Sequence, residues 1–264
     1  GSPLPPTYFL PASPGVLGLN YRHEEKDFID FNIQKTVPHK MSQNGAPMAV
    51  GDINGDNLDD LIIGASALQD EVVFIQVAAG RFQRKDLILK HGKERQAEDA
   101  CLALIDADGD SDLDLVVARG SYENLMSDPA VYNVRYYKND GKGNFTSDTA
   151  VIPTNVRTSA SVIKTADIDL DGDADLFIGG QVLPGYYPKA DKSFILINTS
   201  VSGKTSFEDA TGSWGGSMGD VGIVNDALWS DYDNDGKPDL FIATEWGPVH
   251  IFRNEGTKLS KVVS

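Results

Sequence analysis

The stretch Asp167-Ile-Asp-Leu-Asp-Gly-Asp-Ala-Asp175, followed at once by Leu176-Phe-Ile-Gly179, decides the fold. It contains Asp at position 1, Asp or Asn at position 3, Asp at position 5, a small or turn-forming residue at position 6 and Asp at position 9. This pattern occurs four times, at spacings of 54, 61 and 64 residues. The four acidic loops are residues 52–60, 106–114, 167–175 and 231–239.

The loops hold 18 of the 39 acidic residues of this 264-residue chain, and all 18 are aspartates. A solvated acidic surface would mix Asp with Glu. Carboxylates packed this closely repel one another, so they need either protons or a bound cation. Because the spacing recurs four times, a cation site explains the loops better than four unrelated acidic turns.

Calcium is the expected cation, since it takes six to eight oxygen ligands in irregular geometry whereas magnesium requires an octahedron. An EF-hand loop would need Glu at position 12, but that position holds an aliphatic residue in every copy (Ile63, Val117, Ile178, Ile242). We therefore predict about four Ca²⁺ ions, held by side chains at positions 1, 3, 5 and 9 and by the backbone carbonyl at position 7. The predicted ligands are Asp52, Asn54, Asp56, Leu58, Asp60; Asp106, Asp108, Asp110, Asp112, Asp114; Asp167, Asp169, Asp171, Asp173, Asp175; and Asp231, Asp233, Asp235, Lys237, Asp239.

Short apolar runs precede and follow each loop, a third run comes later, and a Gly-containing turn leads to a weaker fourth strand. Runs of four to six residues rich in β-branched types predict buried strands. Four antiparallel strands repeated at this period are typical of a β-propeller. We therefore expect an all-β chain with an N-terminal arm (1–20) and a propeller (21–264), residues 21–45 adding an outer strand or partial blade. The expected blades are about 46–98, 99–155, 160–215 and 222–264.

The loop Gly51-Asp-Ile-Asn-Gly-Asp56 and its counterparts resemble the FG-GAP/VCBS repeat, the calcium-bearing blade of integrin α-subunit propellers. Segments such as Leu183-Pro-Gly-Tyr-Tyr-Pro188 are similar to bacterial relatives of cartilage acidic protein, in which an ASPIC/UnbV module accompanies the propeller. The first loop departs from the family's usual residues, with Asn54 at position 3 and Asn57 where Gly is usual. The loss of one charge implies a weaker site. Such propellers have about seven blades, so the resemblance implies either part of a larger ring or a compact ring.

Composition excludes several classes of protein. The net charge of −16 argues against a nucleic-acid partner, and no apolar run approaches the ~18 residues of a membrane span. The single Cys101 excludes an intrachain disulfide and a thiolate metal cluster. No signal peptide is visible in this sequence, but Gly1-Ser2 resembles a cloning scar, which is consistent with the removal of a natural leader. Calcium modules of this kind bind at about 10⁻⁴–10⁻³ M, which implies an extracellular, cell-surface or periplasmic location.

Catalytic motifs are weak. Residues 215–219 match the G-x-S-x-G elbow around Ser217, but they lie in a Gly/Ser-rich connection rather than between a strand and a helix. We therefore expect a secreted or cell-surface binding or adhesion module for a glycan or a protein, not an enzyme. The alternative is a polysaccharide lyase or hydrolase in which calcium is structural.

The predicted interaction surface lies opposite the acidic loops. Antiparallel alternation places the connections between second and third strands there, at roughly 65–70, 119–132, 180–192 and 244–248. Exposed aromatic residues are favoured contact residues. We expect Tyr186, Tyr187 and Trp246 to bind the ligand, whereas Tyr122 and Tyr132 fit equally well as covers for the strand ends.

Overall fold

The structure, a computed structural model, describes residues 11–87, 89–124, 131–201, 203–216, 218 and 221–262. These residues form four separate four-stranded sheets. The first contains β1 (Met48–Gly51), β2 (Asp60–Ile63), β3 (Glu71–Ala78) and β4 (Arg81–Leu87), and the second β5 (Asp99–Ile105), β6 (Asp114–Arg119), β7 (Val134–Asn139) and β8 (Phe145–Asp148). The third contains β9 (Ala160–Ala166), β10 (Asp175–Gly180), β11 (Phe194–Asn198) and β12 (Phe207–Asp209), and the fourth β13 (Val224–Ser230), β14 (Asp239–Thr244), β15 (His250–Asn254) and β16 (Leu259–Lys261).

Within each sheet the strands follow chain order and every neighbouring pair is antiparallel. Each acidic loop joins the first strand of its sheet to the second. Its last aspartate begins the second strand and pairs with the residue just before the loop, as in Gly51 with Asp60 and Ser230 with Asp239. The turn between third and fourth strands falls at the same end of the sheet. The connections between second and third strands therefore lie at the opposite end, as the alternation requires.

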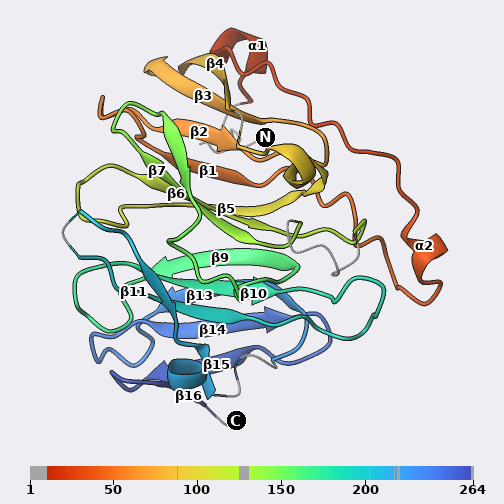
Figure 1. Ribbon diagram of the computed structural model, residues 1–264, viewed down its shortest axis with the longest axis vertical. Coiled ribbons are helices and arrows are strands. Elements are labelled where there is room, and N and C mark those ends of the chain that lie inside the picture. The colour runs from red at the N-terminus through yellow and green to blue at the C-terminus, as the bar shows by residue number, and fades with distance from the viewer. Residues whose placement is uncertain are drawn as a thin grey trace, which may run out of the picture.

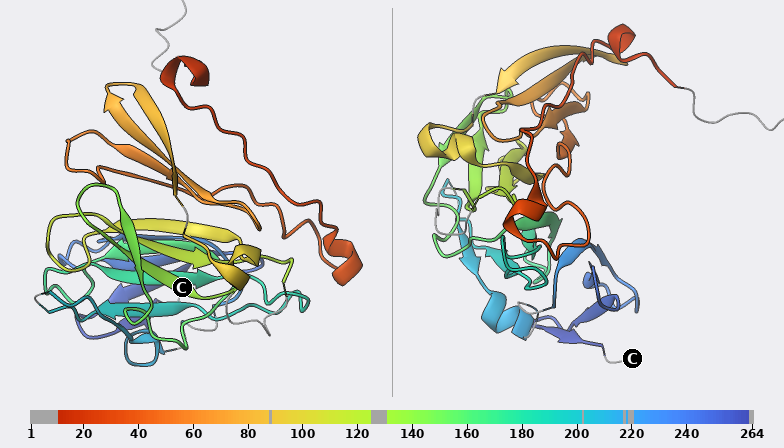
Figure 2. Two further views of the ribbon diagram at one scale, coloured as in Figure 1. Left: turned by 45° about the horizontal axis from the view of Figure 1, so that its top comes forward. Right: turned by 90° about the vertical axis from the view of Figure 1, so that its right-hand side faces the viewer.

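The sheets follow one another in an arc, with the first strands β1, β5, β9 and β13 as successive neighbours (Figures 1 and 2). The first sheet lies at one end of the arc and the fourth at the other. The prediction of an all-β chain with four four-stranded units is confirmed. The arrangement fits a β-propeller.

The hydrophobic core lies between consecutive sheets. Alternate residues of the second strands face opposite sides, so that Ile62, Val116 and Phe177 point toward the next sheet while their neighbours point toward the preceding one. All three are fully buried. Each sheet boundary thus buries its own apolar cluster, at a gain of about 25 cal/mol per Å² of apolar surface removed from water.

Residues 21–45 form no strand, so the expectation of an outer strand or partial blade is wrong. The N-terminal residues instead contain the short helices α1 (Pro14–Leu17) and α2 (Asp30–Ile33) and run across the sheets (Figure 2). The buried Asp30 carboxylate accepts hydrogen bonds from the backbone N–H groups of Met41 and Ser42. These bonds fold the segment back on itself and leave it no extended edge for strand pairing.

Two parts of this N-terminal segment are anchored by apolar contacts. Leu19 and Tyr21 pack beside Phe74, on the face of the first sheet that no sheet of the described residues precedes. Farther along, Val37 and Met41 pack against apolar residues of the later connections. The remaining elements are the 3₁₀ helix η1 (Gly92–Gln96) and the π-helix η2 (Thr211–Gly215).

Candidate metal loops and an aromatic hollow

The four acidic loops share one backbone conformation. Positions 4 and 6 have positive φ angles in every copy, a region that Gly and Asn enter more easily than other residues. Leu170, at position 4 of the third loop, has φ of 63° and is the bulkiest residue in this conformation in the four loops. The positive-φ residues are Gly55, Gly109, Leu170 and Asn234 at position 4, and Asn57, Ser111, Gly172 and Gly236 at position 6.

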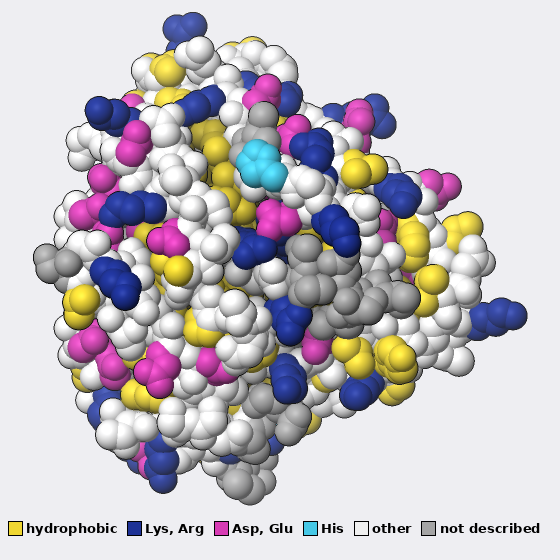
Figure 3. Space-filling model, viewed as in Figure 1, with side chains coloured by type: hydrophobic (Ala, Val, Ile, Leu, Met, Phe, Trp, Pro, Cys, Tyr) yellow, Lys and Arg dark blue, Asp and Glu magenta, His cyan; other side chains and the backbone are white. Residues whose placement is uncertain are grey.

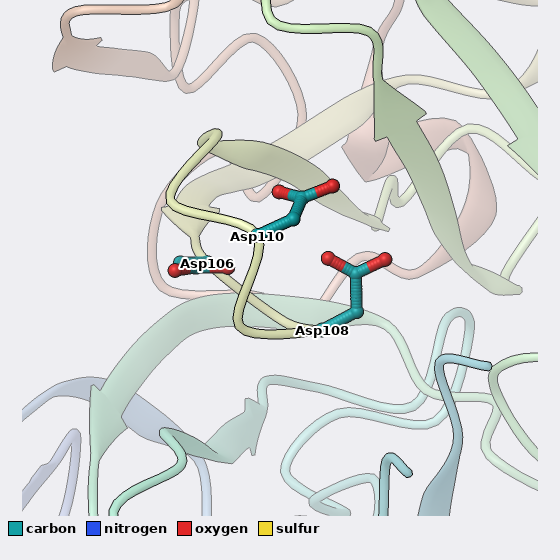
Figure 4. A group of neighbouring side chains, drawn as sticks. All are labelled: Asp106, Asp108 and Asp110. Atoms are coloured by element: carbon teal, nitrogen blue, oxygen red, sulfur yellow. The ribbon is translucent and has the colours of Figure 1, made fainter. Parts of the chain in front are cut away.

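The carboxylate at position 1 holds this turn together. In the second loop Asp106 accepts hydrogen bonds from the backbone N–H groups of Gly109 at 2.9 Å and Ser111 at 3.0 Å. Asp110, at position 5, accepts one from the N–H of Asp112 at 3.0 Å. Equivalent bonds form in the other three loops. The side chains at positions 1, 3 and 5 therefore project from a single tight turn (Figure 4).

The aspartate at position 9 is buried in all four loops. Asp175 accepts hydrogen bonds from the N–H of Asn198 at 2.7 Å and from the N–H of Ile168 at 2.9 Å. It thereby ties the loop to the end of the third strand. Burial raises the pKa of Asp175 to about 7, as expected for a carboxylate withdrawn from water.

Three of the four loops bring three carboxylates to within 4.8 Å of one another. One oxygen each of Asp108 and Asp233, both at position 3, is buried and has no hydrogen-bond partner among the described residues. Clustered carboxylate oxygens with unsatisfied lone pairs fit a hard cation such as Ca²⁺. The first loop has an amide, Asn54, at position 3 and forms no such group of three acidic residues among those described. The three groups are Asp106, Asp108, Asp110; Asp167, Asp169, Asp175; and Asp231, Asp233, Asp239.

Basic side chains of the third strands reach two of the loops. Lys138 forms ion pairs with Asp108 and Asp110 of the second loop, and the hydrogen bond to Asp108 raises the pKa of Lys138. Arg253 lies 2.7 Å from Asp233 in the fourth loop. The equivalent residues of the first and third sheets are Ile75 and Ile197. The third loop therefore has three close carboxylates and no basic residue at this position.

At the opposite end of the sheets, two of the predicted aromatic residues come together. The indole N–H of Trp246 donates a hydrogen bond to the hydroxyl of Tyr187. That hydroxyl in turn donates to Glu245 at 3.3 Å. Both rings line a hollow of about 470 Å³ that also includes Pro188 and Ile223. Trp246 remains 70 % exposed.

The remaining predicted aromatic residues behave differently. Tyr186 is 65 % exposed but does not line the hollow. Tyr122 and Tyr132 are buried, so they cover strand ends. The hydroxyl of Tyr132 donates to the carbonyl of Ser121 at 2.8 Å. Ser217, in the candidate catalytic motif, lies outside the described residues.

Sequence reasoning missed Gln34. Its amide oxygen accepts hydrogen bonds from the backbone N–H of Tyr187 at 2.7 Å and from the hydroxyl of Tyr122 at 2.8 Å. Its amide nitrogen donates to the carbonyl of Tyr187 at 2.5 Å. Gln34 thus fixes the backbone at the edge of the hollow, and no local motif marks a contact between residues this far apart in the chain.

The face shown in Figure 3 carries basic and acidic side chains interspersed with hydrophobic ones. Its acidic groups do not form one continuous patch. Among the helices of the described residues, none has the length and hydropathy needed to cross a membrane.

Comparison with known proteins identifies the repeat. A family model described as an FG-GAP-like repeat matches residues 106–178, which include the second and third acidic loops. No curated protein sequence matches this chain.

Among solved structures, a lectin from Agrocybe aegerita is similar to this chain, with a TM-score of 0.51 and 18 % sequence identity. Its title describes specific recognition of non-reducing terminal N-acetylglucosamine. The match covers 83 % of this chain and 52 % of the lectin, so this chain spans about half the length of that protein. At this identity the similarity concerns the fold. The chain therefore contains an FG-GAP-like repeat in an all-β architecture similar to that of a lectin.

Proposed function

We propose that this chain is a calcium-stabilised binding module that takes a carbohydrate at the hollow lined by Tyr187 and Trp246. The observation that carries the proposal is an exposed tryptophan whose N–H is already bonded to Tyr187, so that the face of the ring remains available. Binding pockets commonly pair apolar and aromatic walls with a few polar groups. Here the polar groups are the hydroxyls of Tyr187 and Thr244, which line the hollow and can form hydrogen bonds with sugar hydroxyls.

Calcium would stabilise the opposite end of the sheets, where the acidic loops lie. The side chains at positions 1, 3, 5 and 9 of each loop, with the carbonyl at position 7, are the proposed ligands. The unpartnered oxygens of Asp108 and Asp233 support this assignment. A bound ion would neutralise the clustered carboxylates and fix the first and second strands of each sheet relative to each other.

The same reasoning supports an extracellular, cell-surface or periplasmic location, because weak calcium sites fill only where free Ca²⁺ is abundant. We also propose that this chain is related to the bacterial relatives of cartilage acidic protein. A lectin-like neighbour and an FG-GAP-like repeat favour binding over catalysis, and adhesion to a glycan-bearing surface is the role that we assign.

The test is a glycan array probed with the calcium-loaded chain, followed by titration of the best glycan in a calorimeter, a readout that does not depend on Trp246. We expect Trp246→Ala to weaken binding by about tenfold or more, the loss of one central aromatic contact. The matched control is Tyr186→Ala, which removes an exposed aromatic ring of the same surface that does not line the hollow.

Binding that survives Trp246→Ala but is lost in Tyr186→Ala would place the ligand elsewhere on this face. An array without any binding, combined with saturable binding of a protein ligand at the hollow, would replace the carbohydrate with a protein. Release of shortened glycan products would identify a lyase or hydrolase instead.

A further inference from the structure

A second hollow, of about 280 Å³, lies where the second, third and fourth sheets meet the N-terminal segment. It is bounded by the starts of β5 and β9 and by the residues that follow β6 and β10, so it lies at the end of the sheets opposite the acidic loops. Residues 44–47 of the N-terminal segment form a further wall. We call this space the Glu98 hollow, and its polar lining includes Glu98, Asp99, Ser121, Ser161, Gln181 and Asn225.

Glu98 is the buried carboxylate of this lining that has few partners. Only 7 % of the residue is exposed. Among the described residues, the hydroxyl of Ser121 is its side-chain hydrogen-bond partner, and no ion pair includes Glu98. A carboxylate can accept about four hydrogen bonds, so most of its acceptor sites are left for the hollow. An ionised carboxylate in such a place is stable only beside further donors or a positive charge.

The buried acidic residues next to Glu98 do have positive charges beside them. Asp99 lies 3.9 Å from the ammonium nitrogen of Lys90 and 3.9 Å from the guanidinium group of Arg119. Glu71 lies 3.7 Å from the same ammonium nitrogen. All four of these side chains are buried. Two carboxylates therefore share two buried cations, whereas Glu98 adds a third carboxylate to the group and brings no cation with it.

The other charged groups around Glu98 are also mainly acidic. Burial and the nearby carboxylates of Glu25 and Glu123 raise the pKa of Glu98 to about 7, and Asp99 acts in the same direction. Lys26 lies close enough to Glu123 to lower the pKa of that carboxyl, and a second basic group, His23, is hydrogen-bonded to Glu25. The hollow is therefore electrostatically suited to a cation.

An amine fits the Glu98 hollow better than a metal ion does. Calcium requires six to eight oxygen ligands, and the close groups of three acidic side chains among the described residues all belong to the acidic loops. An ammonium group has three N–H donors and needs fewer contacts. The side-chain amides of Gln181 and Asn225 make no hydrogen bond with other described residues, so they can contact the rest of such a ligand.

We propose that the Glu98 hollow binds a small amine, whose protonated nitrogen forms an ion pair with the Glu98 carboxylate and whose polar groups contact Gln181 and Asn225. The volume is near the lower limit for ligand pockets, which favours a free small molecule. The Glu98 hollow shares no lining residue with the hollow of Tyr187 and Trp246. The proposal is therefore independent of carbohydrate binding.

Calorimetric titration of the calcium-loaded chain with 1,4-diaminobutane and with ethanolamine tests the site. The neutral analogues 1,4-butanediol and ethylene glycol are the matched ligands. We expect saturable binding of at least one of the amines, at one molecule per chain, and no binding of the analogues. The amine should bind about tenfold more tightly at pH 8 than at pH 6, because Glu98 loses its proton between these values while the amine stays charged.

Two variants locate the amine. Glu98→Gln should weaken binding by about tenfold or more, the loss of one charge-assisted hydrogen bond, and it should fold because it keeps the shape of the side chain and removes a buried charge. Asn225→Trp should block the hollow from an exposed position of its lining. Glu208→Gln, at an exposed position outside the hollow, and Trp246→Ala, in the other hollow, should leave amine binding unchanged.

Three results would overturn the proposal. The first is the absence of binding of both amines at pH 8. The second is binding of equal strength in the parent and in Glu98→Gln, which would assign the amine to other acidic groups such as the loops. The third is equal affinity for an amine and its neutral analogue, because the carboxylate would then contribute nothing to recognition.

Discussion

The ammonium nitrogen of Lys138 lies 3.1 Å from a carboxylate oxygen of Asp110, within the second acidic loop. A basic side chain thus occupies part of the space in which a calcium ion would be bound. Arg253 has the same relationship to the fourth loop, whereas the third loop has Ile197 at the equivalent position. A calcium ion must displace these basic side chains or bind against their charge. Because the third loop has no such side chain at this position, we expect it to bind Ca²⁺ most tightly.

Lys138→Leu should increase the calcium affinity of the second loop by about fivefold, since a partly exposed ion pair contributes about 1 kcal/mol. Calcium titration monitored by calorimetry measures the change. Lys142→Leu is the matched control, because it removes the same charge from an exposed position in the turn between β7 and β8. Equal affinities in the parent and both variants would show that Lys138 does not compete with the ion.

Chelation should lower the melting temperature. A site held at a hundred times its dissociation constant stabilises the fold by about 2.7 kcal/mol, equivalent to about 5–10 °C for a domain of this size. Asp169→Asn should diminish the response to EDTA in thermal unfolding, because it removes a carboxylate from the third loop. Asp148→Asn, outside the loops, should leave it intact. A melting temperature unaffected by EDTA would contradict calcium stabilisation.

Glu98 should make stability depend on pH. It lies in a hollow of about 280 Å³ with Asp99 and Ser121, and burial raises its pKa from 4.5 to about 7. A raised folded-state pKa means that the folded chain binds this proton more tightly. The stabilisation is therefore complete below pH 4.5 and is lost as the pH rises through 7.

Glu98→Gln should consequently be more stable than the parent at pH 8, by about 3 kcal/mol, and nearly equal to it at pH 4.5. Denaturant unfolding of both proteins across this range measures the difference. Glu208→Gln, at an exposed position, is the control. If the difference in free energy of unfolding between parent and variant were the same at all pH values, proton uptake by Glu98 would be excluded.

Asn198→Ala should destabilise the boundary between the second and third sheets. The variant leaves the carbonyl of Ala107 without its partner, at a cost of about 2 kcal/mol and about 4–8 °C in melting temperature. Gln76→Ala is the matched control, since Gln76 has the same place in the first sheet and no described sheet precedes it. Similar losses in both variants would mean that the inter-sheet bond contributes little.

The sheets and loops could be predicted because their determinants are local. Asp-rich turns with Gly, Asn or Ser at position 6, followed by residues such as Leu176 and Phe177, specify a loop and a strand within a dozen positions. Their repetition then implies the stacking of similar units. Asp106, Asp108 and Asp110 lie in one turn for the same reason, because they are close together in the sequence.

The contacts that escaped prediction join distant segments. The association of Gln34 with Tyr187 depends on how residues 21–45 fold around Asp30, which no periodic pattern encodes. From the sequence, Tyr122 fits a contact residue and a cover for the strand ends equally well, and only packing shows that it is buried. The positions of Lys138 and Arg253 could have been predicted from the sequence, because each residue directly precedes the asparagine at the end of a third strand.

The hydrogen bond between Gln34 and Tyr187 spans 153 positions of the chain, whereas the bonds from Asn139 and Asn254 to the preceding loops span 86 each. Contacts of greater sequence separation form later because more chain entropy must be lost first. We therefore expect folding to proceed sheet by sheet, with the N-terminal segment docking in a late phase. The hollow would acquire its final shape only at that point, so a nascent chain would become competent to bind after its scaffold is complete.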